Sequence, residues 1–179
     1  HKKVYKFLHQ SFPAGKPVGI AQNVMSFEPY HKHSIIEQVS VSLNDFFTNH
    51  LFYFLTRGTH DFLGINYYFH ARFKHKGLIP EAVGSSPITH DVSDLGWEIY
   101  PEGLFEVLTD LSDDIPIYIT ECGIASTNDD RRNRFLISYL QEVARAIKAG
   151  CNVRGFFYWS LLDNFEWHEG FTPRFGLVE

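Results

Sequence analysis

The chain has 179 residues, 44% of them hydrophobic, which is enough for one sizeable core. Its net charge of −5 argues against a nucleic-acid partner, and no Lys/Arg run indicates binding to an anionic membrane. The apolar stretches are far shorter than the ~18 residues of a membrane span, and no signal peptide opens the sequence, so we expect no membrane partner. Because two cysteines, Cys122 and Cys151, make no disulfide framework, we expect a cytoplasmic protein.

The start of the chain predicts two helices on either side of a strand. The first ten residues are typical of the last turns of a helix, and PVGIAQNV (17–24) is a short apolar run typical of a buried strand. Apolar residues then recur at helical spacing over residues 34–55, with Ser34 as the candidate N-cap.

The middle of the chain predicts a strand, a long loop and a short helix. DFLGINYY (61–68) has the pattern of a second buried strand. Residues 69–96, rich in Gly, Pro, His and Ser, predict a long loop that is functional or mobile. Pro101 opens a short helix with leucines at helical spacing.

The last third of the chain predicts a strand, a helix and a strand. IPIYITE (115–121) is the third predicted strand, and VRGFFYWSLLD (153–163) is the fourth. Between them, Asp129 or Asp130 is expected to cap a helix that Gly150 ends. The residues expected on its apolar face are Leu136, Tyr139, Leu140, Val143 and Ile147.

Strands that alternate with helices predict a parallel sheet with helices outside it. This sheet is either a doubly wound open sheet or a (β/α)8 barrel. The strand-to-helix turns lack a glycine-rich phosphate loop. In a barrel, the side chains at the carboxyl ends of the strands line the active site. The polar and aromatic residues expected at these ends are Asn66, Tyr68, Thr120, Glu121, Trp159, Asp163 and Glu166. This placement favours the barrel.

Glu121 ends a buried strand, where a carboxylate is costly unless it is paired, hydrogen-bonded or exposed in a cleft. A hydroxyl or amide donor from the same ring would keep it ionised and oriented. Aromatic residues make up 16% of the chain, either as a heavy core or as a cleft that stacks flat ligands. A stacking surface, hydroxyl acceptors and an ionised carboxylate together indicate a sugar site, and retaining glycosidases require such an anionic nucleophile.

Several motifs, in the same order along the chain, resemble glycoside hydrolase family 1, the β-glucosidase and β-galactosidase family. ITECG (119–123) resembles the ITENG nucleophile motif of that family. DFLGINYY and YWSLLDNFEWHEGFTPRFGLVE look like two further motifs, and LGWEIYPEGL matches the stretch before the nucleophile strand. The resemblance covers essentially the whole chain and implies a retaining β-glycosidase that uses no cofactor.

The resemblance also implies roles for individual residues around the reacting sugar. Glu121 would be the nucleophile that forms the glycosyl-enzyme. Tyr68 would donate a hydrogen bond to that carboxylate, and Asn66 would contact the sugar near its 2-hydroxyl.

Five further residues would bind the two ends of the substrate. Glu166 and Trp167 would hold the remote hydroxyls of the glycone, the sugar that is transferred. Trp159 would form the floor of the glycone pocket, and Phe175 would close its side. Trp97 would line the entrance for the leaving group.

The sequence departs from the family pattern at two places. Cys122 follows the nucleophile where the family usually has Asn, and a cysteine nucleophile is disfavoured because no histidine lies close in sequence. Nothing matches the TxNEP motif that carries the acid/base glutamate. SFEPY (26–30) contains a Glu-Pro pair, but it follows the strand that aligns with the fifth barrel strand, so Glu28 is expected in a loop.

The chain is therefore expected to be one partial domain over residues 1–179, with strands five to eight of a barrel. Strands one to four and the last helix would lie outside it, since an eight-stranded barrel takes at least ~200 residues. The expected partners are a β-glycoside or oligosaccharide substrate and the N-terminal half of the same barrel. The alternatives are a non-catalytic sugar-binding or receptor-like relative, or an inactive half-barrel that associates with itself through open sheet edges.

Two smaller expectations concern metals and the core. His31 and His33 form an HxH pair without matching ligands nearby, and no zinc-type spacing occurs, so no metal site is expected. Phe157, on the fourth predicted strand, is expected in the core, whereas Glu166 is expected to be partly enclosed.

Overall fold

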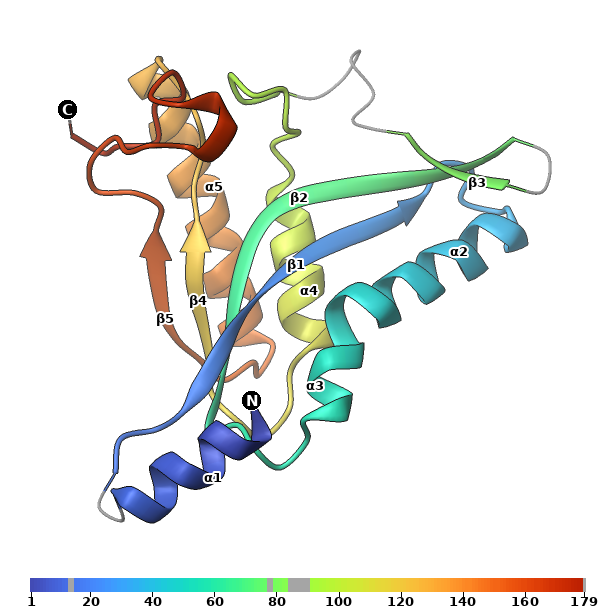
Figure 1. The fold of residues 1–179 in the computed structure, drawn as a ribbon. Helices are drawn as coiled ribbons and strands as arrows, with labels where there is room; N and C mark the ends of the chain where they lie inside the picture. Colours follow the sequence, from blue (N-terminus) through green and yellow to red (C-terminus); the bar gives the residue numbers. More distant parts are fainter. Residues whose placement is uncertain (13–14, 77–78, 84–90, 179) are drawn as a thin grey trace.

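The computed structural model describes residues 1–12, 15–76, 79–83 and 91–178. One sheet contains, in order, the parallel strands β1 (Gly19–Pro29), β2 (Phe62–Lys76), β4 (Ile117–Cys122) and β5 (Val153–Tyr158), and β3 (Ile79–Val83) pairs antiparallel with β2 (Figure 1). Each parallel strand lies beside the next one along the chain. A doubly wound sheet reverses its strand order, whereas a barrel keeps it. The predicted half of a (β/α)8 barrel is therefore confirmed.

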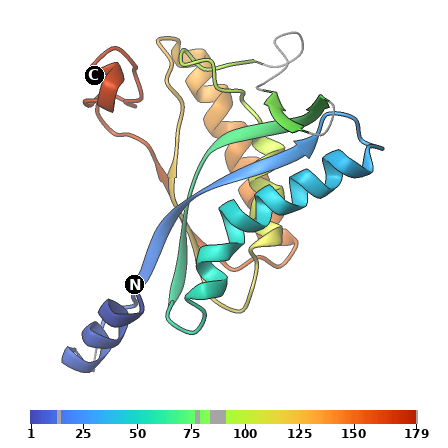
Figure 2. The same ribbon diagram turned by 45° about the vertical axis from the view of Figure 1, so that its right-hand side comes forward.

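The helical segments flank this sheet. They are α1 (Lys2–Ser11), α2 (Ile35–Asp45), a π-helix (Phe46–His50), α3 (Leu51–Leu55), α4 (Pro101–Asp110), α5 (Asp129–Lys148) and a 3-10 helix (Trp167–Glu169). Helices α2 to α5 lie on one side of the curved sheet (Figures 1 and 2). Within the part of the chain described, no helix combines the length and the apolarity needed to cross a membrane.

The core lies between the strands and helices α4 and α5. Its strand side consists of branched residues such as Ile65 on β2 and Ile119 on β4, both fully buried. Its helix side includes Leu104 and Leu108 of α4. Branched side chains suit a strand that is packed by helices, so the apolar strand pattern is explained by this packing.

The buried face of α5 differs in part from the predicted one. The apolar residues it buries are Phe135, Tyr139, Val143 and Ala146. Leu140 and Ile147, which were expected on this face, are 42% and 50% exposed. They follow the buried positions Tyr139 and Ala146 directly, so they lie about 100° further round the helix and beside the face that meets the core.

The predicted loop over residues 69–96 is wrong in its first part. Strand β2 continues to Lys76, and β3 pairs with it, while residues 77–78 and 84–90 lie outside those described. Because β2 is long, β1 continues beside it to Pro29, with Glu28 opposite Arg72. Glu28 therefore lies in a strand and not in the loop predicted for it.

The predicted helix caps are confirmed once and corrected once. The Ser34 hydroxyl accepts a hydrogen bond from the backbone N–H three residues on, at 3.4 Å, as predicted for an N-cap. The helical segment that follows contains the π-helix, which the sequence did not predict. At α5 the cap is Asn128 rather than Asp129 or Asp130, and both aspartates occupy the first turn instead.

Phe157 is not a core residue, because it is 56% exposed. Its neighbours Phe156 and Tyr158 pack against the core on the helix side. Since side chains alternate along a strand, Phe157 faces the opposite side of the sheet, away from this core. Strand β5 ends at Tyr158, so residues 159–163 of the predicted strand lie outside the sheet.

Candidate active site

Glu121 lies at the carboxyl end of β4, between the ends of β2 and β5. Its register partner on β2 is Asn66, and the register shifts between Ile65 and Asn66. The Tyr68 hydroxyl donates a 2.8 Å hydrogen bond to Oε2 of Glu121. The strand therefore places the carboxylate at the open end of the sheet with a donor on the neighbouring strand.

Tyr68 is held in its protonated form. Burial raises the pKa of its hydroxyl well above the ordinary value, and the hydrogen bond to Glu121 and the charge of that carboxylate raise it further. A protonated phenol donates its hydrogen bond at any working pH. This bond fixes which carboxylate oxygen of Glu121 faces away from Tyr68.

Asn66 is oriented by Thr120, the residue before Glu121. The Thr120 hydroxyl lies 2.6 Å from Oδ1 of Asn66 and 3.1 Å from the backbone oxygen of Ile65. Because Oδ1 accepts from Thr120, the two N–H groups of the Asn66 amide are directed elsewhere and can donate to a hydroxyl in the pocket.

A pocket of about 290 Å³ opens beside Glu121. It is lined by all eight residues to which the family resemblance assigns a role, namely Asn66, Tyr68, Trp97, Glu121, Trp159, Glu166, Trp167 and Phe175. It is also lined by Asn23 and Phe69, which sequence reasoning missed. Asn23 lies on β1 opposite Asn66, so the rule that selected Asn66, a polar residue near a strand end, would have found it too.

One wall of the pocket is aromatic. The rings of Trp97 and Phe69 lie 4.7 Å apart, and Trp97 also contacts Tyr68 at 5.9 Å and Phe175 at 6.1 Å between ring centroids. Phe175 is almost completely buried, which makes it the back of this wall. Such a wall presents flat apolar faces to a ligand bound beside Glu121.

Trp159 is held beside Glu121 by a close backbone contact. A Cβ atom added at Gly123 would lie 1.8 Å from the backbone oxygen of Trp159, so only glycine fits there. The Trp159 N–H donates a 3.0 Å hydrogen bond to the oxygen of Cys122. The glycine of the ITECG motif therefore has a packing role that sequence reasoning did not identify.

Glu166 and Trp167 come from the segment after β5. The Glu166 N–H donates to the Gly170 oxygen at 2.7 Å, which closes a tight turn. Glu166 is half-buried, as predicted, whereas Trp167 is 79% exposed at the rim.

Asp163, predicted at the strand ends, does not line this pocket and instead holds the segment after β5 together. Its carboxylate accepts from Arg174 at 2.6 Å and from the Gly176 N–H at 2.8 Å. Partial burial opposes its ionisation, but these two donors hold the pKa of Asp163 below its ordinary value.

The geometry disfavours the two alternative reactive groups. Cys122 is fully buried, and burial raises the pKa of its thiol well above the ordinary value, so it stays a thiol. Glu28 lies outside the pocket, where it accepts a 2.8 Å hydrogen bond from Tyr100 and pairs with Arg72.

Comparisons with known proteins identify the family of this chain. The family described as glycosyl hydrolase family 1 matches residues 4–179. The β-galactosidase of Saccharolobus solfataricus is 37% identical over 92% of this chain. A β-glycosidase structure from Pyrococcus horikoshii matches 98% of this chain with a TM-score of 0.83 at 33% identity. The family 1 β-glucosidase of Thermotoga maritima matches 98% of it with a TM-score of 0.85 at 27% identity.

These relatives are much longer than this chain. It covers 39% of the Saccharolobus protein, 46% of the Pyrococcus structure and 48% of the Thermotoga structure. The chain belongs to glycosyl hydrolase family 1.

Proposed function

We propose that this chain is the C-terminal half of a retaining β-glycosidase that removes terminal non-reducing β-D-glycosyl residues. Glu121 attacks the anomeric carbon and forms a glycosyl-enzyme, which water then hydrolyses. The observation that carries this proposal is the Glu121 carboxylate, hydrogen-bonded by Tyr68 in an aromatic-walled pocket that also holds Glu166.

The remaining pocket residues suit a bound sugar. Asn66, with its oxygen occupied by Thr120, donates near the 2-hydroxyl. Glu166 accepts hydrogen bonds from the remote hydroxyls, beside Trp167 at the rim, and Trp159 lies under the ring. Trp97 extends the aromatic wall toward the leaving group. Relatives named β-galactosidase and β-glucosidase support a glucoside or galactoside as the glycone.

The acid/base glutamate comes from the N-terminal half of the barrel. A leaving group of ordinary basicity needs a proton donor, and in a retaining enzyme its carboxyl lies about 5–5.5 Å from the nucleophile. The exposed apolar side chains of this chain support the proposal that the N-terminal half of the barrel packs against it. They include Phe157 on the sheet and Ile35, Val39, Leu43, Phe47 and Phe54 on the helical segment after β1. We expect the N-terminal half to cover much of this surface.

We propose the cytoplasm as the location, since both cysteines are free and buried, which suits a reducing compartment. Two alternatives to the enzyme are a non-catalytic sugar-binding relative and a half-barrel that associates with itself. The carboxylate and its tyrosine donor count against the first. The second predicts a stable oligomer of this chain alone.

Activity measurements test the proposed function. This chain alone should hydrolyse no unactivated β-glycoside at an appreciable rate, because the proton donor is missing. Assembled with a fragment that carries strands one to four of a family 1 barrel, here called the completed protein, it should hydrolyse β-glucosides or β-galactosides. Proton NMR should show the β-anomer as the first product. An inverted first product, or a completed protein that binds sugar without turnover, contradicts the proposal.

A further inference from the structure

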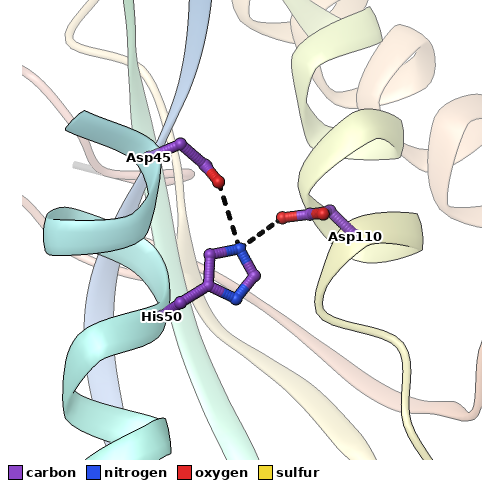
Figure 3. Close-up of side chains that lie close together, drawn as sticks. All are labelled: Asp45, His50 and Asp110. Carbon is purple, nitrogen blue, oxygen red and sulfur yellow. Dashed lines mark hydrogen bonds and ion pairs between the residues drawn. The ribbon is translucent and has the colours of Figure 1, made fainter. Parts of the chain in front are cut away.

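A histidine and two aspartates converge outside the pocket, between α2 and α4 (Figure 3). Asp45 ends α2, His50 ends the π-helix that follows, and Asp110 ends α4. Nε2 of His50 lies 3.1 Å from Oδ2 of Asp45 and 2.5 Å from Oδ2 of Asp110. Each residue offers one ligand atom, and these atoms lie within 4.8 Å of one another.

Asp45 is held in place by a buried side chain. Nδ2 of Asn49 donates to Oδ1 of Asp45 at 2.7 Å, which leaves Oδ2 directed toward His50. Asn49 is 1% exposed, and its amide also exchanges two hydrogen bonds with the backbone of Met25 on β1. An outer hydrogen bond of this kind is typical of metal-binding carboxylates, because it fixes the ligand before the ion arrives.

The same place has space for further ligands. A cavity of about 210 Å³ lies beside Asp45 and Asp110 and is also bordered by Glu106. Glu106 accepts a 2.9 Å hydrogen bond from the Ser26 hydroxyl. Three carboxylates, those of Asp45, Glu106 and Asp110, line this cavity and favour a cation beside it, although His50 does not line it. Its volume admits water molecules as additional ligands.

We propose that Asp45, His50 and Asp110 bind one divalent transition-metal ion, with Zn²⁺ as the best fit. One imidazole nitrogen and two carboxylate oxygens suit Zn²⁺, which takes a water as its fourth ligand. Bonds of about 2.0–2.2 Å in a tetrahedron place ligand atoms roughly 3.3 Å apart. The contact of His50 with Asp45 is already close to this separation. Asp110, with a side chain 53% exposed, has room to move outward when the ion replaces the proton on Nε2.

A bound ion would connect the end of α2 to the end of α4. These two ends are far apart in the sequence, and both pack on the sheet from the outside. The ion therefore stabilises the folded chain by RT ln(1 + c/Kd), where c is the concentration of free zinc, so the effect rises with that concentration. A protonated His50 between the two aspartates is the competing explanation, and it predicts a stability that does not depend on zinc.

The test is a zinc titration of the purified protein after treatment with a chelator. We expect calorimetry to give one Zn²⁺ per chain, together with a rise in the melting temperature that chelator reverses. His50→Gln keeps an N–H donor for the aspartates but removes the imidazole ligand. It should lower the affinity for Zn²⁺ at least about tenfold and abolish the rise. The matched control is His33→Gln, at an exposed histidine of the HxH pair, which should bind zinc like the unchanged protein.

Asp110→Asn is a second variant in case His50→Gln does not fold, since it changes an exposed side chain. It should also lose affinity at least about tenfold. The proposal is overturned if the unchanged protein shows no rise in melting temperature with zinc. It is also overturned if His50→Gln or Asp110→Asn folds and binds zinc as tightly as the unchanged protein, because the ion then binds elsewhere.

Discussion

The Tyr68 hydroxyl, from β2, donates a 2.8 Å hydrogen bond to the Glu121 carboxylate at the end of β4. A hydrogen bond to a charged group contributes about 1.5–3 kcal/mol. Tyr68→Phe removes this donor and keeps the aromatic ring. We therefore expect the rate constant for glycosyl-enzyme formation in the completed protein to fall about 10- to 100-fold.

Tyr118→Phe is the matched control, because it removes a hydroxyl from β4 itself. The ring of Tyr118 contacts Phe62, and Tyr118 does not line the pocket. Pre-steady-state kinetics with an activated glycoside would measure both variants. Equal rates for Tyr68→Phe and the unchanged protein would show that this bond does not orient the nucleophile.

Glu166→Ala tests the assignment of the remote sugar hydroxyls. If Glu166 accepts from the 6-hydroxyl, its loss should lower kcat/KM for glucosides and galactosides about 10- to 100-fold more than for fucosides, which lack that hydroxyl. The control is Glu169→Ala, an exposed carboxylate three residues away that pairs with His168. Equal losses on all three sugars would rule out this contact.

Gly123→Ala tests the close approach between β4 and Trp159. The added Cβ would lie 1.8 Å from the Trp159 oxygen, so the backbone has to move, at a cost of about 1–3 kcal/mol. Gly58→Ala is the control, because no atom lies within 4 Å of its added Cβ and only its φ of +74° is unfavourable. Thermal unfolding and near-ultraviolet circular dichroism measure the effect. If Gly123→Ala is no less stable than Gly58→Ala and its tryptophan signals are unchanged, the close backbone approach does not require glycine at position 123.

Glu37→Gln tests a buried carboxylate at the start of α2. Burial alone would raise the pKa of Glu37, but hydrogen bonds from the ring and backbone of His31 and from the backbone of His75 lower it to about 2. The folded-state pKa is below the unfolded value of 4.5, so Glu37 stabilises the fold above that value and loses this effect as pH falls toward 2.

The free energy of unfolding of the unchanged protein should therefore exceed that of Glu37→Gln most near neutral pH. This difference should narrow as the pH falls from about 5 to about 2, which urea unfolding at a series of pH values measures. A difference that stays constant over this range would show that the carboxylate charge is not what stabilises the fold.

Much of the site could be predicted because its residues lie in short local motifs. Glu121, Asn66 and Tyr68 each stand near the carboxyl end of an apolar strand, and the strands alternate with helices, so parallel order brings these ends together. The packing role of Gly123 could not be predicted this way, since it depends on how closely the backbone of Trp159 approaches.

Predictions that depend on long-range packing were less accurate. Residues 69–76 were included in the predicted loop because the range 69–96 as a whole is rich in Gly, Pro, His and Ser. Residues 69–73 nevertheless pair with β1, which in turn keeps Glu28 in a strand. Phe157 was expected in the core because it is apolar, but it faces the side of the sheet away from the helices and is exposed. An apolar residue type alone does not show which face of the sheet it lies on. The cluster around His50 was missed because Asp110 is sixty residues away from it and the π-helix was not predicted.

The most direct test of the central claim is covalent labelling of the nucleophile. The completed protein is incubated with a 2-deoxy-2-fluoro-β-glycoside that carries a reactive leaving group, digested, and analysed by mass spectrometry. We predict one glycosyl group per protein, attached to Glu121, and a Glu121→Gln variant that folds normally, takes no label and loses activity by orders of magnitude. A label on Cys122 or Glu28, or on any other residue in place of Glu121, would contradict the proposed nucleophile.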